Sequence, residues 1–317
     1  MPVNLTFDVS AAVPGGETLT QTAWAFVPAR PSEARAVLVC LAGGCYDKHY
    51  WHLEVEGYPG YSFGEHLAEA GYIVIALDHL GIGESSDPTD SGPIGLDLLA
   101  EGDAEVARQI SAKVAEGSLL PDAPPMALPI VGVGHSMGSC LTTMVQAKHG
   151  VYDAVVLLGY GVNITNVYDH DAAGDDLVTR LQQNIINTCQ MAGVSPDDSH
   201  LIGPRSVLAP MFYASEVPQA VMDADEAVQS RVPVRAAAEV TTPGFVEKYT
   251  PQVDVPVLLA FGAAIDVSPN PYAEPANYTA STDVTLHLVA GSGHCHNFAS
   301  HRAQLWDRIA AWLPAVV

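Results

Sequence analysis

A serine between two glycines is the residue of this sequence best suited to nucleophilic chemistry. The segment Gly134-His135-Ser136-Met137-Gly138 directly follows an apolar run and directly precedes a helical pattern. A G-x-S-x-G pattern between a strand and a helix is typical of a nucleophile elbow, where a strained turn holds the serine hydroxyl clear of the sheet. Glycines two residues before and after the serine suit this turn because larger side chains would collide there. The alternative is an ordinary turn of small residues, and the strand–turn–helix context favours a catalytic Ser136.

Two histidines near the C-terminal end could act as a base or as metal ligands. His294 and His296 flank Cys295 in the segment VAGSGHCHNF, residues 289–298. A zinc site needs three or four converging ligands. The residues that could complete such a cluster are His79, His135 and Asp266. Because a serine nucleophile itself needs a base, we predict one catalytic histidine in this segment, and neither a metal nor another cofactor.

Five short segments spread along the chain form a recognisable series. They are LAGG (41–44), DHLGIGES (78–85), GHSMG (134–138), FGAAIDVSP (261–269) and GSGH (291–294). Together they resemble the α/β-hydrolase superfamily over nearly the whole chain, and in that superfamily the serine is followed by an acid and then a histidine. The resemblance implies Ser136 as nucleophile, Asp266 as acid and His294, directly after the glycine turn, as base. His296 is then a neighbour that supports the site or contacts a cap.

The acid has one rival in the sequence and one alternative role. Glu274 lies further along the same loop as Asp266, and Asp266 itself could cap a turn in the segment DVSPNP. The end of the preceding strand, GYGVN (159–163), offers no carboxylate. We therefore expect Asp266 to orient the base.

The resemblance also implies an oxyanion hole and a substrate pocket. Backbone N–H groups of Met137 and Gly44 are the expected oxyanion donors, and Cys45 is a further candidate. Aromatic residues near the expected mouth favour an apolar or aromatic substrate, although they could instead pack a cap against the core. The predicted substrate-binding residues are Tyr46, Trp51, Phe212 and Tyr213.

These residues require a sheet that brings its strand ends together. Apolar, β-branched runs alternate with helical patterns, which predicts an α/β fold with a mostly parallel sheet covered on both faces. The expected strands are residues 36–42, 72–78, 128–134, 153–159, 255–262 and 284–290, and the expected helices are residues 61–71, 95–117, 139–150 and 302–313. Two alternating runs before residue 30, NLTFDVS and QTAWAFVP, predict an antiparallel hairpin at a sheet edge.

The segment 163–250 interrupts this alternation. Its patterns are mostly helical and include no convincing central strand. An insertion between two strands commonly covers the active site as a lid. We predict a hydrolase core of residues 1–162 and 251–317, with a helical cap of residues 163–250.

The composition restricts the partners of the chain. Apolar residues make up 48% and the mean hydropathy is +0.17, which is enough to build a core. With 13 basic and 36 acidic residues the net charge is −23, which disfavours nucleic acid and anionic membranes as partners. The five cysteines include no CxxC pair, and the start MPVNLTFDVS has no secretory pattern. We therefore expect reduced thiols, a cytoplasmic location and a small-molecule substrate, and a homo-oligomer is compatible with the sequence.

The predicted activity is hydrolysis of a carboxylic ester or lactone through an acyl-enzyme. C–C bond hydrolysis and acyl transfer use the same three residues and stay open as alternatives. A non-catalytic binding protein of this fold is less favoured because all three triad positions are filled. The natural substrate, its stereochemistry and the roles of His296 and Cys45 are not defined by the sequence.

Overall fold

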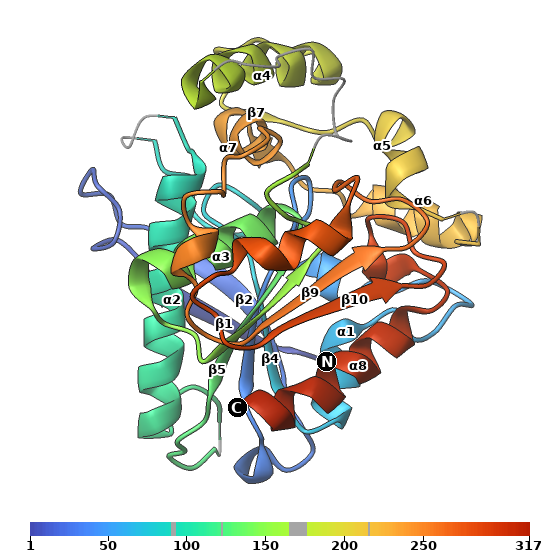
Figure 1. The fold of residues 1–317 in the computed structure, drawn as a ribbon. Coiled ribbons are helices and arrows are strands. Elements are labelled where there is room, and N and C mark those ends of the chain that lie inside the picture. Colours follow the sequence, from blue (N-terminus) through green and yellow to red (C-terminus); the bar gives the residue numbers. More distant parts are fainter. Residues whose placement is uncertain (90–92, 122, 165–175, 215) are drawn as a thin grey trace.

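The computed structural model describes residues 1–89, 93–121, 123–164, 176–214 and 216–317. An eight-stranded sheet lies at the centre of this described part, with strand order β1-β2-β4-β3-β5-β6-β9-β10 (Figure 1). The strands are β1 Val3–Asp8, β2 Thr20–Phe26, β3 Val37–Leu41, β4 Ile73–Leu77, β5 Ile130–His135, β6 Ala154–Leu158, β9 Val257–Gly262 and β10 Val284–Val289. The predicted α/β class and the positions of the predicted strands are confirmed.

The sheet is parallel except at one edge. Strands β4, β3, β5, β6, β9 and β10 run parallel, while β1 and β2 form the predicted antiparallel hairpin and β2 pairs antiparallel with β4. The central strands are fully buried, as expected for strands covered on both faces. Strand β10 differs, because it forms the other edge of the sheet and most of its side chains are half-exposed.

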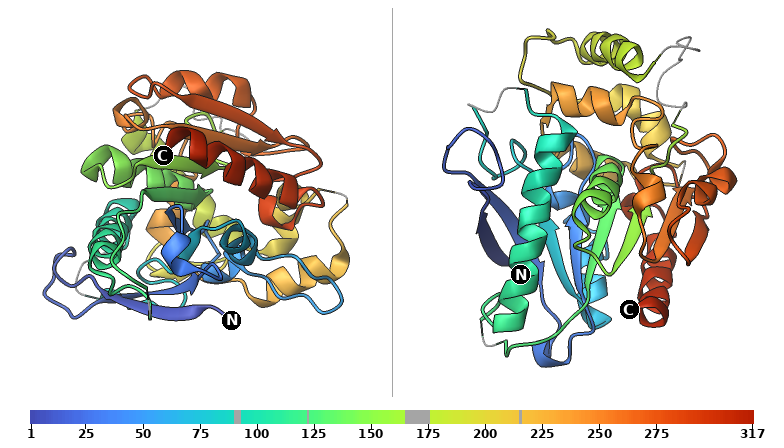
Figure 2. Two further views of the ribbon diagram at one scale, coloured as in Figure 1. Left: turned by 90° about the horizontal axis from the view of Figure 1, so that it is seen from below. Right: turned by 60° about the vertical axis from the view of Figure 1, so that its left-hand side comes forward.

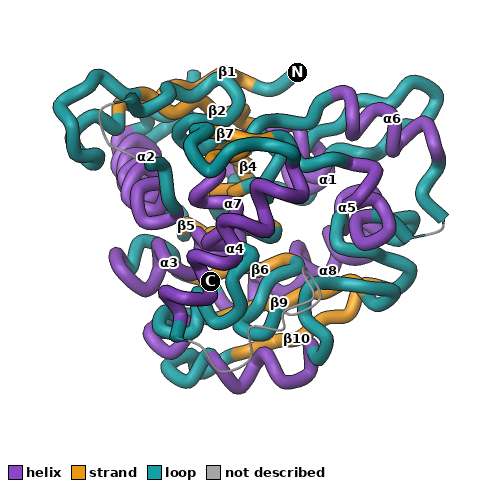
Figure 3. The backbone as a smooth tube through the Cα atoms, turned by 90° about the horizontal axis from the view of Figure 1, so that it is seen from above, coloured by secondary structure: helices purple, strands orange, loops and turns teal. Residues whose placement is uncertain are grey.

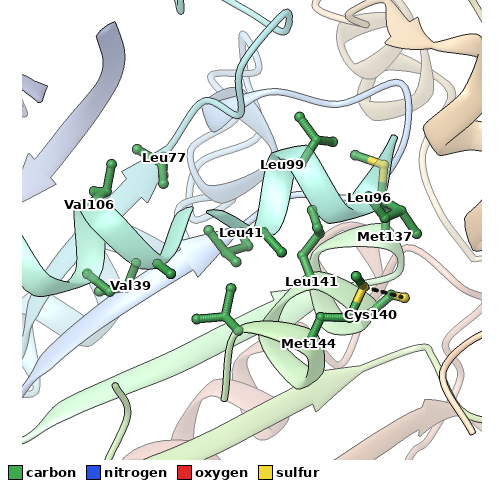
Figure 4. Packing of buried hydrophobic residues seen from close by; sticks show 14 of the residues in the cluster. Val39, Leu41, Leu77, Leu96, Leu99, Val106, Met137, Cys140, Leu141 and Met144 are labelled. Carbon is green, nitrogen blue, oxygen red and sulfur yellow. Dashed lines mark hydrogen bonds between the residues drawn. The ribbon is translucent and has the colours of Figure 1, made fainter. Parts of the chain in front are cut away.

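Two pairs of helices cover the two faces of the sheet (Figure 2). Helices α2 (Leu96–Glu116) and α3 (Met137–His149) pack with Val37, Val39 and Leu41 of β3. Helices α1 (Phe63–Glu69) and α8 (Arg302–Val316) pack with Leu38 and Cys40, which point to the opposite face. Figure 4 shows part of the first cluster, with Leu141 and Met144 of α3 in the same layer as Leu99 of α2. The alternation of β3 side chains thus divides the core into two layers.

A mainly helical segment connects β6 to β9. Its described elements are α4 Leu177–Ala192, β7 His200–Leu201, α5 Arg205–Phe212, α6 Gln219–Ala227, β8 Val232–Pro233 and α7 Val234–Val240, and β7 pairs only with β8. In Figures 1 and 3 this segment lies over one end of the sheet. Residues 165–175 and 215 of the predicted cap lie outside the described residues, and the division into core and cap stays a prediction. Among the described helices, none combines the length and the apolar character needed to cross a membrane.

Candidate active site

Ser136 occupies a strained turn between β5 and α3. Its φ of 53° lies in the left-handed region, which is rare for a residue with a side chain. A Cβ atom at Gly134 would collide with the carbonyl group of Gly138, and one at Gly138 would collide with the carbonyl oxygen of Leu41. The Ser136 N–H donates to the Leu158 carbonyl oxygen at 2.8 Å, which fixes the turn to β6. These contacts account for the glycine spacing that the sequence shows.

His294 and Asp266 form a buried pair just beyond the ends of β10 and β9. The His294 Nδ1 atom lies 2.7 Å from Asp266 Oδ1. Backbone N–H groups of Gly262 and Val267 donate to the same carboxylate at 2.6 and 2.8 Å. Burial alone would raise the pKa of Asp266, but His294 and His296 outweigh burial and hold it far below its usual range. Since an ionised carboxylate only accepts hydrogen bonds, His294 donates from Nδ1 and its Nε2 atom carries the free lone pair of the neutral ring.

The second histidine of the segment also contacts this carboxylate. His296 Nε2 lies 3.1 Å from Asp266 Oδ2. The rival acid Glu274 lies elsewhere in the loop, where it accepts hydrogen bonds from Val162 N–H and Ser268 Oγ. The structure therefore joins Asp266, and not Glu274, to both histidines.

His135, next to the predicted nucleophile, is held in the interior. Its ring stacks on Tyr50 with centroids 4.2 Å apart, and its Nε2–H donates to the His294 carbonyl oxygen at 2.9 Å. Burial, together with the neighbouring His294 and His296, holds the pKa of His135 well below its usual value. A neutral His135 thus supports the backbone of the histidine loop.

Ser136 and His294 both line a cavity of about 640 Å³ between the strand ends and the helical segment. Its wall is mostly apolar and includes Leu201, Val207, Leu208, Met211, Phe212, Val232, Val240, Ile265 and Val267. No Asp, Glu, Lys or Arg is among the described residues that line it. A cavity of this size and character is typical of a site for a neutral small molecule.

The predicted oxyanion donors belong to two segments next to Ser136, the loop after β3 and the start of α3. Gly44 and Cys45 line the cavity, and a Cβ atom at Gly43 would come within 3.0 Å of the Ser136 Cβ. Met137 is the first residue of α3, so its N–H has no partner within the helix. Cys45 has a φ of 64°, a strained conformation at the same loop.

Only one of the four predicted substrate-binding aromatics lines the cavity. Phe212 does so, with its ring centroid 5.6 Å from that of His294. Trp51 is buried against Phe63, with ring centroids 4.9 Å apart. The hydroxyl groups of Tyr46 and Tyr213 both bond to Asp225. These three aromatics thus pack behind the cavity, which is the alternative role that the sequence left open.

A buried ion pair close to the site was not predicted from the sequence. Arg205 Nε of α5 lies 3.0 Å from Asp225 Oδ2 of α6, and both side chains are shielded from solvent. The guanidinium group lies over the Tyr46 ring, 4.3 Å from its centroid. The Tyr46 hydroxyl in turn lies 3.2 Å from Cys295 Sγ. The only available signal was a charged residue inside the apolar segment LIGPRSVLAP (201–210).

In the described part of the chain, the remaining sulfur and metal-binding side chains form no further site. All five cysteines are free and buried. Within the described ranges, no group of three or more His, Cys, Asp or Glu side chains is arranged to hold a metal ion.

Comparisons with known proteins place these observations in a family. A family model described as serine aminopeptidase, S33, matches residues 56–298. A thermophilic esterase from Thermogutta terrifontis is 14% identical to this chain, with a TM-score of 0.66. A carboxyl esterase from Bacillus coagulans is 18% identical, also with a TM-score of 0.66. Each of these two comparisons covers 99% of this chain and 98% of the other. A bromoperoxidase from Bacillus anthracis is 18% identical with a TM-score of 0.60, covering 98% of this chain and 100% of its own. No curated protein matches the sequence. At these identities the solved structures show a shared fold.

Proposed function

The chain belongs to the serine aminopeptidase S33 family, within the α/β-hydrolase superfamily, and from this premise we propose that it is a serine hydrolase. Its substrate is a carboxylic ester or lactone with a small, apolar or aromatic acyl group. The observation that carries the proposal is that Ser136 and His294 line one apolar cavity while His294 is bonded to Asp266.

Each group has a defined part in this reaction. His294 takes the proton of Ser136 Oγ through its free Nε2 atom as the serine attacks the ester carbonyl. Asp266 holds the imidazole in the tautomer that can accept this proton and stabilises the imidazolium that forms. Backbone N–H groups of Gly44 and Met137 stabilise the oxyanion. His294 then gives its proton to the leaving alcohol, and water attacks the acyl-enzyme by the same route.

A fluorophosphonate probe tests the nucleophile directly. We expect stoichiometric labelling of the protein, with the adduct on Ser136 by peptide mass spectrometry, because the probe mimics the tetrahedral intermediate. Ser136→Ala should not be labelled, and the exposed Ser300→Ala should be labelled like the parent. An unlabelled parent would contradict the proposal and favour a non-catalytic binding protein. A labelled parent that cleaves no ester would favour C–C bond hydrolysis or acyl transfer.

The cavity wall predicts a preference for neutral acyl groups. An aminopeptidase must bind the free ammonium group of its substrate, and an ammonium buried without a carboxylate is strongly disfavoured. No carboxylate is among the described residues of this cavity. We therefore expect p-nitrophenyl esters to be cleaved with kcat/KM rising about fourfold for each added methylene until the cavity is filled. Aminoacyl p-nitroanilides should be cleaved far more slowly, and the reverse order would contradict this choice of substrate.

A further inference from the structure

We propose that His296 is a positioning residue, whose Nε2–H holds Asp266 and thereby sets the basicity of His294. This inference rests on the function proposed above. The two histidines of the segment then have different roles, because His294 transfers the proton and His296 acts on Asp266.

The two oxygens of Asp266 divide the donors between them. Oδ1 accepts from His294 Nδ1 and from the Val267 N–H, at 2.7 and 2.8 Å. Oδ2 accepts from the Gly262 N–H and from His296 Nε2, at 2.6 and 3.1 Å. Each oxygen therefore accepts from a backbone N–H and from an imidazole N–H. His296 stands in the same relation to Oδ2 as His294 does to Oδ1.

The surroundings of His296 prevent it from acting as the base. Its side chain is completely buried and is not among the residues that line the cavity with Ser136. Because the ionised Asp266 only accepts, the proton on His296 must sit on Nε2. The Nδ1 atom of His296 has no hydrogen-bond partner in the described part of the chain. Among the described residues no group accepts a hydrogen bond from that buried nitrogen, so His296 can act on the site only as a donor through Nε2.

The hydrogen bond from His296 changes how strongly Asp266 stabilises the protonated His294. A carboxylate that shares its negative charge with a second N–H stabilises the His294 imidazolium less. Removing the His296 donor should therefore make His294 more basic. Since the reaction needs neutral His294, the acid limb of the kcat/KM profile should then move to higher pH. Oδ2 also loses one of its anchors, so the plateau of kcat/KM should fall.

Within the described residues, few other titratable groups lie around Asp266, His294 and His296. Those that face them from neighbouring elements are His135 on β5, Tyr50 beside it, His287 on β10, Cys295 between the histidines, and the Arg205–Asp225 pair of α5 and α6. Burial lowers the pKa of His135 and of His287 and raises that of Cys295 and Tyr50. At neutral pH the side chains of His135, His287, Cys295 and Tyr50 are uncharged, and the charges of Arg205 and Asp225 cancel. Substitutions at His296 therefore leave the surrounding charge unchanged.

Three substitutions test the inference. In His296→Leu we expect the acid limb of kcat/KM for a p-nitrophenyl ester to move up by about one pH unit. The plateau should fall about tenfold. His296→Phe, which keeps a planar ring without the donor, should show the same shift and covers the case in which the Leu variant does not fold. His296→Gln can place an amide N–H near Nε2 and should restore the parental midpoint.

The result also has a readout apart from catalysis. The ring protons of His294 can be followed by NMR across the same pH range in the parent and in each variant, whatever the reaction turns out to be. An unchanged midpoint in both donor-free variants, or no restoration by Gln, would overturn the role of His296. Failure of the proposed function is distinguishable, because it appears as an unlabelled parent in the fluorophosphonate experiment.

Discussion

His294→Gln should lower kcat/KM for a p-nitrophenyl ester by about 10⁴-fold or more at pH 8. Glutamine cannot take the proton of Ser136, so the serine attacks as a neutral hydroxyl, which is a weak nucleophile. Substrate should still bind, since the apolar wall of the cavity is unchanged, and the loss should appear in kcat more than in KM. Stopped-flow and steady-state measurements on the same ester series would separate the two.

The adjacent histidines supply the comparison for this result. His296→Gln should retain activity within about tenfold, because Gln can still donate to Asp266. His301→Gln makes the same change seven residues after His294, directly before α8, and should behave like the parent, because the His301 ring lies beside Ser300 Oγ and the Gly291 turn. If His296→Gln lost activity as His294→Gln does, or if His294→Gln remained active, the assignment of the base would be wrong.

Much of the fold followed from local patterns. The central strands are continuous apolar runs because both faces of the sheet are covered. The elbow contains glycines at positions 134 and 138 because no larger residue fits there beside Ser139 and Leu41. Both kinds of signal are local in sequence, so a single chain reveals them. The half-exposed β10 was not distinguished from the buried strands, because an edge position depends on pairing partners rather than on the residues of the strand.

The parts of the site that the sequence missed are long-range contacts. Tyr46 was expected at the substrate, but its hydroxyl bonds to Asp225, 179 residues away. His296 was expected near the site, but its bond to Asp266 depends on how the turns after β9 and β10 meet. No spacing rule specifies such pairs. They become visible only when the segments that carry them are placed together.

The helical segment is joined to the histidine loop by its backbone. The N–H groups of His294 and Cys295 donate to the carbonyl oxygens of Met211 and Phe212 at the end of α5, each at 2.9 Å. A Cβ atom at Gly293 would come within 2.8 Å of those same oxygens. The Cys45 carbonyl oxygen, beside the predicted oxyanion donor, accepts from the Ser230 N–H at 3.0 Å. The stability of this segment therefore bears directly on the geometry around Ser136.

Arg205→Met should consequently destabilise the protein by about 3–5 kcal/mol at pH 8, because it leaves the Asp225 carboxylate buried without its cation. Urea unfolding should show this loss in the free energy of unfolding, and thermal unfolding should show a fall in Tm of about 10 °C. The exposed pair of Arg231 with Asp87 gives the matched control, since Arg231→Met removes the same group from a surface ion pair worth about 1 kcal/mol or less.

The pH dependence of this loss identifies its cause. Burial raises the pKa of Asp225 against the opposing effect of Arg205 and of the hydrogen bonds from Tyr213 and Tyr46. Without Arg205 the pKa of Asp225 in the folded protein should rise further. The folded state then binds a proton that the unfolded state releases, so the stability of the protein falls as pH rises. The deficit of Arg205→Met should therefore shrink between pH 8 and pH 5.5, and Arg205→Met/Asp225→Leu should recover much of it at both pH values. A deficit that is independent of pH and unchanged in the double variant would mean that Arg205 acts through its packing on Tyr46 and Phe212 rather than through its charge.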